Sequence, residues 1–347
     1  MKMPTTPEEG NMGRHLFKRT GMTLLLMVVL VAGAVGTARP QAMRNVVRFG
    51  VVAVPSTTYY APLVVAQQKG FFDQEGVQLN QIVIGPDDNL VRAVAGGALD
   101  LGIPEVSIAI NGNAHGAPVK VIASLTDRYP YDLFARQTIK SYADLRGKTI
   151  AHWTIAPEVS VALIRRLLAA GGLKEGEYNL IAGGNLSTRY AALSRGAVDA
   201  AVLTAPFNLL ARQNGLTVLG GLYDIPAVFA GVVANTNWVS SHSDAVDKVL
   251  KALIRGFRYA ANPANKAEVV KMLADLGKVD PGVVGQTYDQ FYRDQTYLTS
   301  WDLAPSLRSM QGVIDILGGL GQVPKSASPL AYFELSYLNR ALREVGR

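Results

Sequence analysis

The pattern of hydrophobic and polar positions predicts a β-α-β unit near the start of the folded chain. Residues 49–54 form an apolar, β-branched run that ends at a proline, as a buried strand with a sharp stop does. A polar and aromatic loop follows at 56–60, and a proline-initiated helix is predicted from 62 to a closing glycine at 70. Residues 77–84 predict the second strand. The loop after the first strand then lies at the carboxyl edge of the sheet, where a helix N-terminus favours ligands with acceptor groups.

Strand-like and helix-like patterns alternate through the middle of the chain and give way to helices at its end. Further strands are predicted at 100–103, 119–125, 131–135, 149–153, 180–181, 198–203 and 230–234. The strand at 131–135 is expected to continue the same sheet as the strand at 119–125. Helical spacing dominates from Asp244, with segments at 246–257, 266–276, 283–292, 307–317 and 330–345. The chain is therefore expected to form an α/β fold, and its helical last third is expected to cover the first sheet.

A weak internal sequence repeat predicts two related lobes. Residues 97–103 (GALDLGI) resemble residues 196–202 (GAVDAAV), and each segment follows a short helix. In both, glycine closes the helix in a left-handed conformation and aspartate opens the next strand. A loop with Pro104 or Pro206 follows each strand. We expect each lobe to place such a loop toward a common crevice. The alternative is that the pattern reflects only the glycines and prolines that end helices and strands in any α/β fold.

The N-terminus has the organisation of a secretory signal peptide. Basic residues at 14–19 precede an uncharged apolar run at 22–35, and the small residues Gly36 and Ala38 follow. We assign residues 1–38 to this signal and expect a periplasmic protein. A retained anchor is the alternative, although the run is short for a bilayer span. The chain has no cysteine, which excludes disulfides, thiolate catalysis, Cys-ligated metals and a lipid anchor on an N-terminal cysteine.

Composition and the absence of several motifs argue against nucleic-acid binding, enzyme activity and metal binding. The chain has 347 residues, 49% hydrophobic and 18% charged, which is enough for two packed lobes. The net charge of +7 is scattered without the basic stripe that nucleic-acid binding needs. Neither a P-loop nor a G-x-S-x-G motif occurs, and the histidines lack metal-ligand spacing; they are His15, His115, His152 and His242. We expect no enzyme activity, no metal and no cofactor.

An ordered set of short motifs resembles a known family. The set begins with YAPLVVA at 60–66, GFF at 70–72 and EGV at 75–77, and continues with 97–102, DLRGKTIA at 144–151 and 196–200. The chain resembles substrate-binding proteins of ABC transporters, in the nitrate, sulfonate and taurine branch that also includes thiamine-pyrimidine-precursor binders. The resemblance covers about residues 46–276 well and the last helices loosely.

The resemblance implies a two-lobe periplasmic-binding-protein fold of type II. Residues 45–130 would form the first lobe, 131–234 the second, and 235–347 would return to the first. Crossings near Tyr131 and Ala230 would act as a hinge, and ligand would close the lobes for docking on an ABC permease in the inner membrane. A monomeric receptor without a cofactor is expected.

Candidate ligand-binding residues lie in loops that follow the strands. The set is Thr57, Thr58, Tyr59, Glu105, Val106, Trp153, Thr154, Glu158, Thr204, Pro206 and Phe207. The threonines could equally form a turn and a helix cap. Either glutamate could cap the helix that follows it, where a carboxylate favours the positive end of the dipole, and Trp153 could fill the core instead of stacking on a ligand.

The candidate residues also bear on the class of ligand. The family often has a Gly-Ser pair in the loop that reads WTIAPE at 153–158 here. Glu105 and Glu158 would repel an anion, so besides sulfonate-, nitrate- or taurine-like ligands we consider a planar, pyrimidine-like or amine-bearing ligand. Two alternative functions remain: an enzyme on the same fold, related to pyrimidine-precursor synthases, and a ligand-sensing module without transport. The export signal and the lack of cysteine argue against the enzyme.

Overall fold

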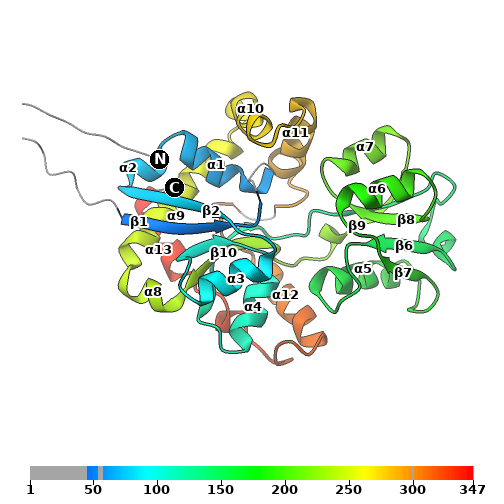
Figure 1. Cartoon of the computed structure of the whole chain (residues 1–347), viewed down its shortest axis with the longest axis horizontal. Coiled ribbons are helices and arrows are strands. Elements are labelled where there is room, and N and C mark those ends of the chain that lie inside the picture. The colour runs from blue at the N-terminus through cyan, green and yellow to red at the C-terminus, as the bar shows by residue number, and fades with distance from the viewer. Residues whose placement is uncertain (1–44, 54–57, 299–300, 347) are drawn as a thin grey trace, which may run out of the picture. The chain divides into compact units, whose positions relative to one another are not determined.

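The protein contains two five-stranded mixed sheets, each with its own set of helices (Figure 1). The structure is a computed structural model that describes residues 45–53, 58–298 and 301–346. The strand orders are β2-β1-β3-β10-β4 in the first sheet and β7-β6-β8-β5-β9 in the second. The α/β class and the two-lobe organisation predicted from the sequence are confirmed. The predicted signal segment, residues 1–38, lies outside the described residues.

The first sheet contains the β-α-β unit that the sequence predicts. Strands β1 (Asn45–Val51) and β2 (Val77–Val83) pair in parallel, and helix α1 (Ala61–Gln68) connects them. The sheet is completed by β3 (Leu101–Ile103), β4 (Val119–Thr126) and β10 (Ala230–Asn235), with β10 antiparallel to both neighbours. The short helices of this part are η1 (Thr58–Tyr60), α2 (Phe71–Gln74), α3 (Asp87–Ala95) and α4 (Val106–Ala114).

The second sheet is built from the middle of the chain. Its strands are β5 (Asp132–Ala135), β6 (Thr149–His152), β7 (Asn179–Ala182), β8 (Ala200–Leu203) and β9 (Thr217–Gly221). Its helices are η2 (Tyr142–Leu145), α5 (Val159–Ala170), α6 (Leu186–Ser194), α7 (Phe207–Gln213) and η3 (Leu222–Asp224). The sequence pattern did not predict α7 or β9. Strand β5 lies here because it pairs with β8 and β9, so the expectation that it continues the first sheet is wrong.

The boundary of the second lobe also differs from the prediction. Strand β10 pairs with β3 and β4, so residues 230–234 belong to the first sheet. The chain enters the second sheet between β4 and β5 and returns between β9 and β10. The two crossing segments are joined by backbone hydrogen bonds: Phe229 N–H donates to the Thr126 carbonyl at 3.1 Å, and Leu222 N–H to the Tyr131 carbonyl at 2.9 Å.

The C-terminal helices pack mainly on the first sheet. Helix α9 (Ser243–Ala261) contacts α1 and α13 (Ser336–Val345), and α13 also contacts β4. The apolar positions that the sequence predicts for α9 are buried; they are Val246, Val249, Leu250, Leu253, Ile254 and Phe257. The remaining elements are α8 (Thr236–Ser241), η4 (Pro263–Asn265), α10 (Lys266–Gly277), α11 (Pro281–Tyr288), the π-turn η5 (Asp289–Arg293), α12 (Leu307–Gly319) and η6 (Pro329–Ala331). In the described part of the chain, we find no helix with the length and apolarity that a bilayer crossing requires.

The internal sequence repeat at 97–103 and 196–202 has a structural counterpart in the two sheets. Gly97 and Gly196 adopt the left-handed conformation, with φ of +75° and +74°. Asp100 Oδ2 accepts the Arg48 backbone N–H at 2.8 Å, and Asp199 Oδ2 accepts the Thr149 backbone N–H at 3.0 Å. Each aspartate therefore binds the strand that neighbours its own, Asp100 in the middle of β1 and Asp199 at the first residue of β6.

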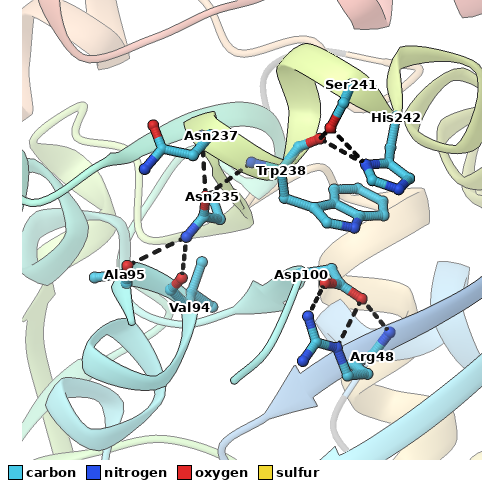
Figure 2. Close-up of polar contacts among 9 residues, drawn as sticks. All are labelled: Arg48, Val94, Ala95, Asp100, Asn235, Asn237, Trp238, Ser241 and His242. Carbon is cyan, nitrogen blue, oxygen red and sulfur yellow. Dashed lines mark hydrogen bonds and ion pairs between the residues drawn. The ribbon is translucent and has the colours of Figure 1, made fainter. Parts of the chain in front are cut away.

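The surroundings of Asp100 connect the first strands to the return of the chain (Figure 2). The Arg48 side chain also donates to the Asp100 carboxylate, through Nε at 3.1 Å and through Nη2. Nearby, Asn235 Nδ2 donates to the Val94 carbonyl at 2.7 Å, and its Oδ1 accepts the Trp238 N–H at 3.0 Å. Asn235 thus caps α8 and ties β10 to the end of α3.

Candidate ligand-binding site

A cavity of about 360 Å³ opens where the carboxyl ends of strands from both sheets meet. Its walls come from β-strand ends and helix starts of both lobes. The lining residues are Val52, Tyr59, Asp87, Ile103, Pro104, Glu105, Tyr131, Trp153, Asn185, Leu186, Arg189, Thr204, Phe229 and Ala230. This is the place where open α/β sheets generally bind ligands.

The first-lobe wall is acidic. Glu105 precedes α4, but its carboxylate does not accept a backbone N–H of that helix. Its Oε1 instead accepts the Ser107 hydroxyl at 2.6 Å and the Tyr129 hydroxyl at 2.7 Å. The Glu105 backbone N–H donates to Asp87 Oδ1 at 2.6 Å. Among the described residues both bonds to the Glu105 carboxylate end on Oε1, which leaves Oε2 as an acceptor for a ligand.

The acidic groups of this wall hold protons more tightly than usual. Burial raises the pKa of Glu105 to about 7, while the hydroxyls of Ser107 and Tyr129 oppose the shift and the charges of Asp87 and Glu158 add to it. Burial also raises the pKa of Asp87 in this wall, and that of Glu158, which precedes α5 in the second lobe. A cationic group in the cavity would offset this mutual repulsion and favour the ionised carboxylates.

The second-lobe wall carries one buried cation. Arg189 is 3% exposed and extends from α6. Its Nε donates to the Val202 carbonyl at 2.9 Å, and its Nη1 donates to the Gly184 carbonyl at 2.6 Å. Asn185 caps the same helix by accepting the Thr188 N–H at 2.9 Å. The guanidinium and the helix N-terminus make this wall favourable for an acceptor group of a ligand.

Aromatic rings complete the site. Tyr131 lies between Trp153 and Phe229, with ring centroids 4.8 Å and 5.9 Å away. Arg189 lies 5.5 Å from the centre of the Trp153 ring. Trp153 also stacks on His152, with ring centroids 3.7 Å apart, and burial lowers the pKa of that imidazole to about 4. The tryptophan is therefore held by a neutral partner while part of its surface faces the cavity.

The structure brings part of the predicted residue set together. Tyr59, Glu105, Trp153 and Thr204 line this cavity. Thr58 and Pro206 line an adjoining cavity, together with Tyr59 and Thr204. Thr57 lies outside the described residues.

Four predicted residues line neither cavity. Val106 is buried in the first core and its N–H donates to the Phe229 carbonyl at 2.7 Å. The Thr154 carbonyl accepts His152 Nδ1–H at 2.8 Å, and the Glu158 carboxylate accepts the Ser160 hydroxyl. Phe207 packs on Tyr190, with ring centroids 5.2 Å apart.

Sequence reasoning missed other residues that line the cavity: Asp87, Tyr131, Asn185, Arg189 and Phe229. The sequence pattern predicts a turn at 85–88, which includes Asp87, and a helix at 188–195, which includes Arg189. A usable signal was present for Asp87 and Asn185, because each stands at the start of a helix that follows a predicted strand of its lobe.

The two α/β lobes, the paired crossing segments and the cavity between the strand ends define a periplasmic-binding-protein fold. The chain belongs to the NMT1/THI5 like family, whose family model matches residues 57–267.

Solved structures agree with this fold at low sequence identity. The alkanesulfonate-binding protein SsuA from Xanthomonas axonopodis pv. citri is 18% identical with a TM-score of 0.65, over 85% of this chain and 100% of that one. The periplasmic nitrate-binding protein NrtA from Synechocystis PCC 6803 is 16% identical with a TM-score of 0.67, over 87% of this chain and 89% of that one.

Sequence relatives carry two kinds of name. A 4-amino-5-hydroxymethyl-2-methylpyrimidine phosphate synthase from Aspergillus parasiticus is 23% identical, over 75% of this chain and 81% of that protein. A synthase of the same name from Legionella pneumophila is 27% identical, but the match spans only 35% of this chain and 39% of that protein. The riboflavin-binding protein RibY from Chloroflexus aurantiacus is 26% identical, over 59% of this chain and 60% of that protein.

Proposed function

We propose that this protein is an extracytoplasmic solute-binding receptor of an ABC importer. The two-lobe fold and its similarity to sulfonate- and nitrate-binding proteins support this assignment. Ligand would bring the lobes together about the two crossing segments, and the closed form would deliver it to a membrane permease. The predicted export signal, and the periplasmic proteins among the structural neighbours, support a periplasmic location.

The ligand is a planar or amine-bearing nitrogen compound. One observation carries this assignment: Glu105 and Asp87 form one wall of the cavity, and Trp153 stands in the wall that the second lobe supplies. A ligand N–H or ammonium group donates to Glu105 Oε2, and a flat ring packs against the indole. An acceptor atom at the other end of the ligand faces Arg189. The pyrimidine named in the synthase relatives has this distribution of donors and acceptors.

A thermal-shift screen tests the ligand class. Purified protein is heated with aminopyrimidines and arylalkylamines in one panel, and with nitrate, alkanesulfonates and taurine in another. We expect stabilisation by the first panel only, and its loss in Glu105→Gln. Stabilisation by anions alone would contradict the assignment. Mass spectrometry of a ligand that copurifies with the protein gives an independent identification.

An enzyme on the same fold is the second candidate, because several relatives are named synthases. The part of the cavity wall that the structure describes has neither histidine nor cysteine. Incubation of each stabilising compound with the protein, followed by mass spectrometry, separates the two functions. Recovery of the unchanged compound supports the receptor, and a new mass supports the enzyme. Uptake of the labelled compound by cells with and without the protein separates transport from sensing.

A further inference from the structure

A second cavity of about 270 Å³ adjoins the acidic one. The two cavities share five lining residues: Tyr59, Tyr131, Leu186, Thr204 and Phe229. Three of these are aromatic, and the Tyr59 and Tyr131 rings both meet Phe229 edge-on at 5.9 Å. The rings therefore form a common border between the two spaces.

The chemistry of the two cavities differs. Asp87, Glu105 and Arg189 line the first. The described residues that line the second include neither a carboxylate nor a lysine or arginine. Its remaining walls are Thr58, Pro130, Ala205, Pro206, Val279, Val283, Val284, Thr287 and Phe291. The polar group of a ligand is favoured in the first cavity and an apolar group in the second.

We propose that the ligand is amphipathic, with its nitrogen-bearing head in the acidic cavity and an apolar tail in the second cavity, beside the rings of Tyr59, Tyr131 and Phe229. This inference rests on the proposed function for the head of the ligand, and it adds the tail.

The size of the cavities fits a ligand that spans both. Small-molecule pockets usually enclose about 300–1,000 Å³, and the second cavity alone, at about 270 Å³, falls below that range. Each buried methylene contributes about 0.8 kcal/mol, which is about a fourfold gain in affinity. A short alkyl tail is enough for a large effect.

The tail would also contact both lobes. Val283 and Val284 belong to α11, which packs on η1 of the first lobe. Thr204, Ala205 and Pro206 follow β8 of the second lobe. When the lobes approach, an apolar group between these walls has more of its surface removed from water. A ligand with a tail therefore favours the closed form more than a ligand that consists of the head alone.

A ligand series tests the inference. The probes are 4-amino-2-methylpyrimidines with hydrogen, ethyl or butyl at C5, and calorimetry measures the dissociation constant of each. We expect the butyl compound to bind at least about tenfold more tightly than the unsubstituted one. Val283→Asp places a charge in the second cavity and should remove most of this gain. Val279→Asp, outside the helices, is a second test if the first variant folds poorly. Val46→Asp is the control, since Val46 is 56% exposed near the amino end of β1.

Each outcome decides between the proposals. A tail-dependent gain that Val283→Asp or Val279→Asp removes, and that Val46→Asp retains, supports the inference. Equal affinity for all three compounds overturns the tail while leaving the proposed function in place. A gain that all variants retain overturns the placement of the tail. If no compound of the series binds, both the head assignment and the tail built on it are overturned.

Discussion

Tyr129 donates its hydroxyl to Glu105 Oε1 at 2.7 Å, and Glu105 lines the acidic cavity between the strand ends. The bond stabilises the ionised carboxylate, whereas burial, the largest influence, favours the protonated one. The balance places the pKa of Glu105 at about 7, so small changes near this residue alter its charge at neutral pH.

Affinity for a cationic ligand should depend on pH. Glu105 is mostly ionised above pH 7 and mostly protonated below it. Affinity for benzylamine, whose ammonium group stays charged over this range, should fall as the pH is lowered from 8 to 5, by at most about tenfold per unit. Calorimetric titration at several pH values measures this. Glu105→Gln should bind weakly with little pH dependence, and an equally steep dependence in that variant would contradict the role of Glu105.

The stability of the ligand-free protein should change in the opposite sense. The folded-state pKa of Glu105, about 7, lies above its usual value of 4.5, so the folded protein retains a proton that the unfolded chain releases. Stability from this group is present below about pH 4.5 and is lost as the pH rises to about 7. Glu105→Gln should therefore be more stable than wild type at pH 8, by up to about 3 kcal/mol, and similar at pH 4. Urea unfolding measures the difference, with the exposed Glu175→Gln as a control.

Removal of the Tyr129 hydroxyl should weaken binding through Glu105. Tyr129→Phe leaves Ser107 as the donor to that carboxylate among the described residues, so the pKa of Glu105 should rise further. Benzylamine affinity at pH 7 should fall several-fold, and the midpoint of its pH dependence should move upward. The matched control is Tyr288→Phe, which removes a hydroxyl that donates to the Ala260 carbonyl at 2.7 Å. Both variants should lose about 1 kcal/mol of stability. Equal loss of affinity in the two would show a general effect of destabilisation.

Trp153 should report directly on the ligand. A planar compound that packs on its indole should change the intrinsic fluorescence, and Trp153→Leu should abolish that change and weaken affinity about tenfold. Trp238→Leu, far along the chain at α8, should preserve both the change and the affinity. A ligand-induced signal that persists in Trp153→Leu would place the ligand elsewhere.

Local sequence patterns predicted much of the fold because the periodic segments are long or well bounded. The β-α-β unit has a Pro-started helix between two β-branched runs, and α9 repeats its apolar positions over five turns. Strand β9 was missed because its sequence, TVLGG, is short and has two glycines. The assignment of β10 to the first sheet could not be predicted either, since it depends on pairing with β3 and β4 over more than 100 residues of chain.

The candidate site was predicted where strand ends have polar or aromatic residues, as at Glu105 and Trp153. Cavity residues were missed where they lie in the middle of a helix or in a segment that connects the two lobes. Arg189 lies within α6, where arginine usually faces solvent, yet here packing buries the guanidinium. Phe229 lies on the returning crossing segment, and only the joining of the two crossings brings it to the cavity.

The repeated aspartates of the two sheets should contribute unequally to stability. Asp100 is 2% exposed and binds both the backbone and the side chain of Arg48. The Asp199 side chain is 23% exposed, and its arginine partner, Arg136, is 3.6 Å away. Replacement by alanine removes an acceptor from a backbone N–H in both cases, but only at Asp100 does it also break a close ion pair whose carboxylate is buried, although its Arg48 side chain is 42% exposed. Asp100→Ala should therefore cost about 2–4 kcal/mol, and Asp199→Ala about 1–2 kcal/mol.

Hydrogen exchange should show where each loss acts, because each aspartate fixes a strand of its own sheet. Asp100→Ala should accelerate amide exchange in β1 and β3, and Asp199→Ala should do so in β6 and β8. The control is Asp275→Ala, whose exposed ion pair with Lys271 lies within α10 and should contribute less than about 0.5 kcal/mol. Asp→Asn retains an acceptor oxygen and should restore part of the loss at both positions. Uniform acceleration over both sheets by either alanine variant would mean that the lobes unfold as one unit, and that the aspartates do not act locally.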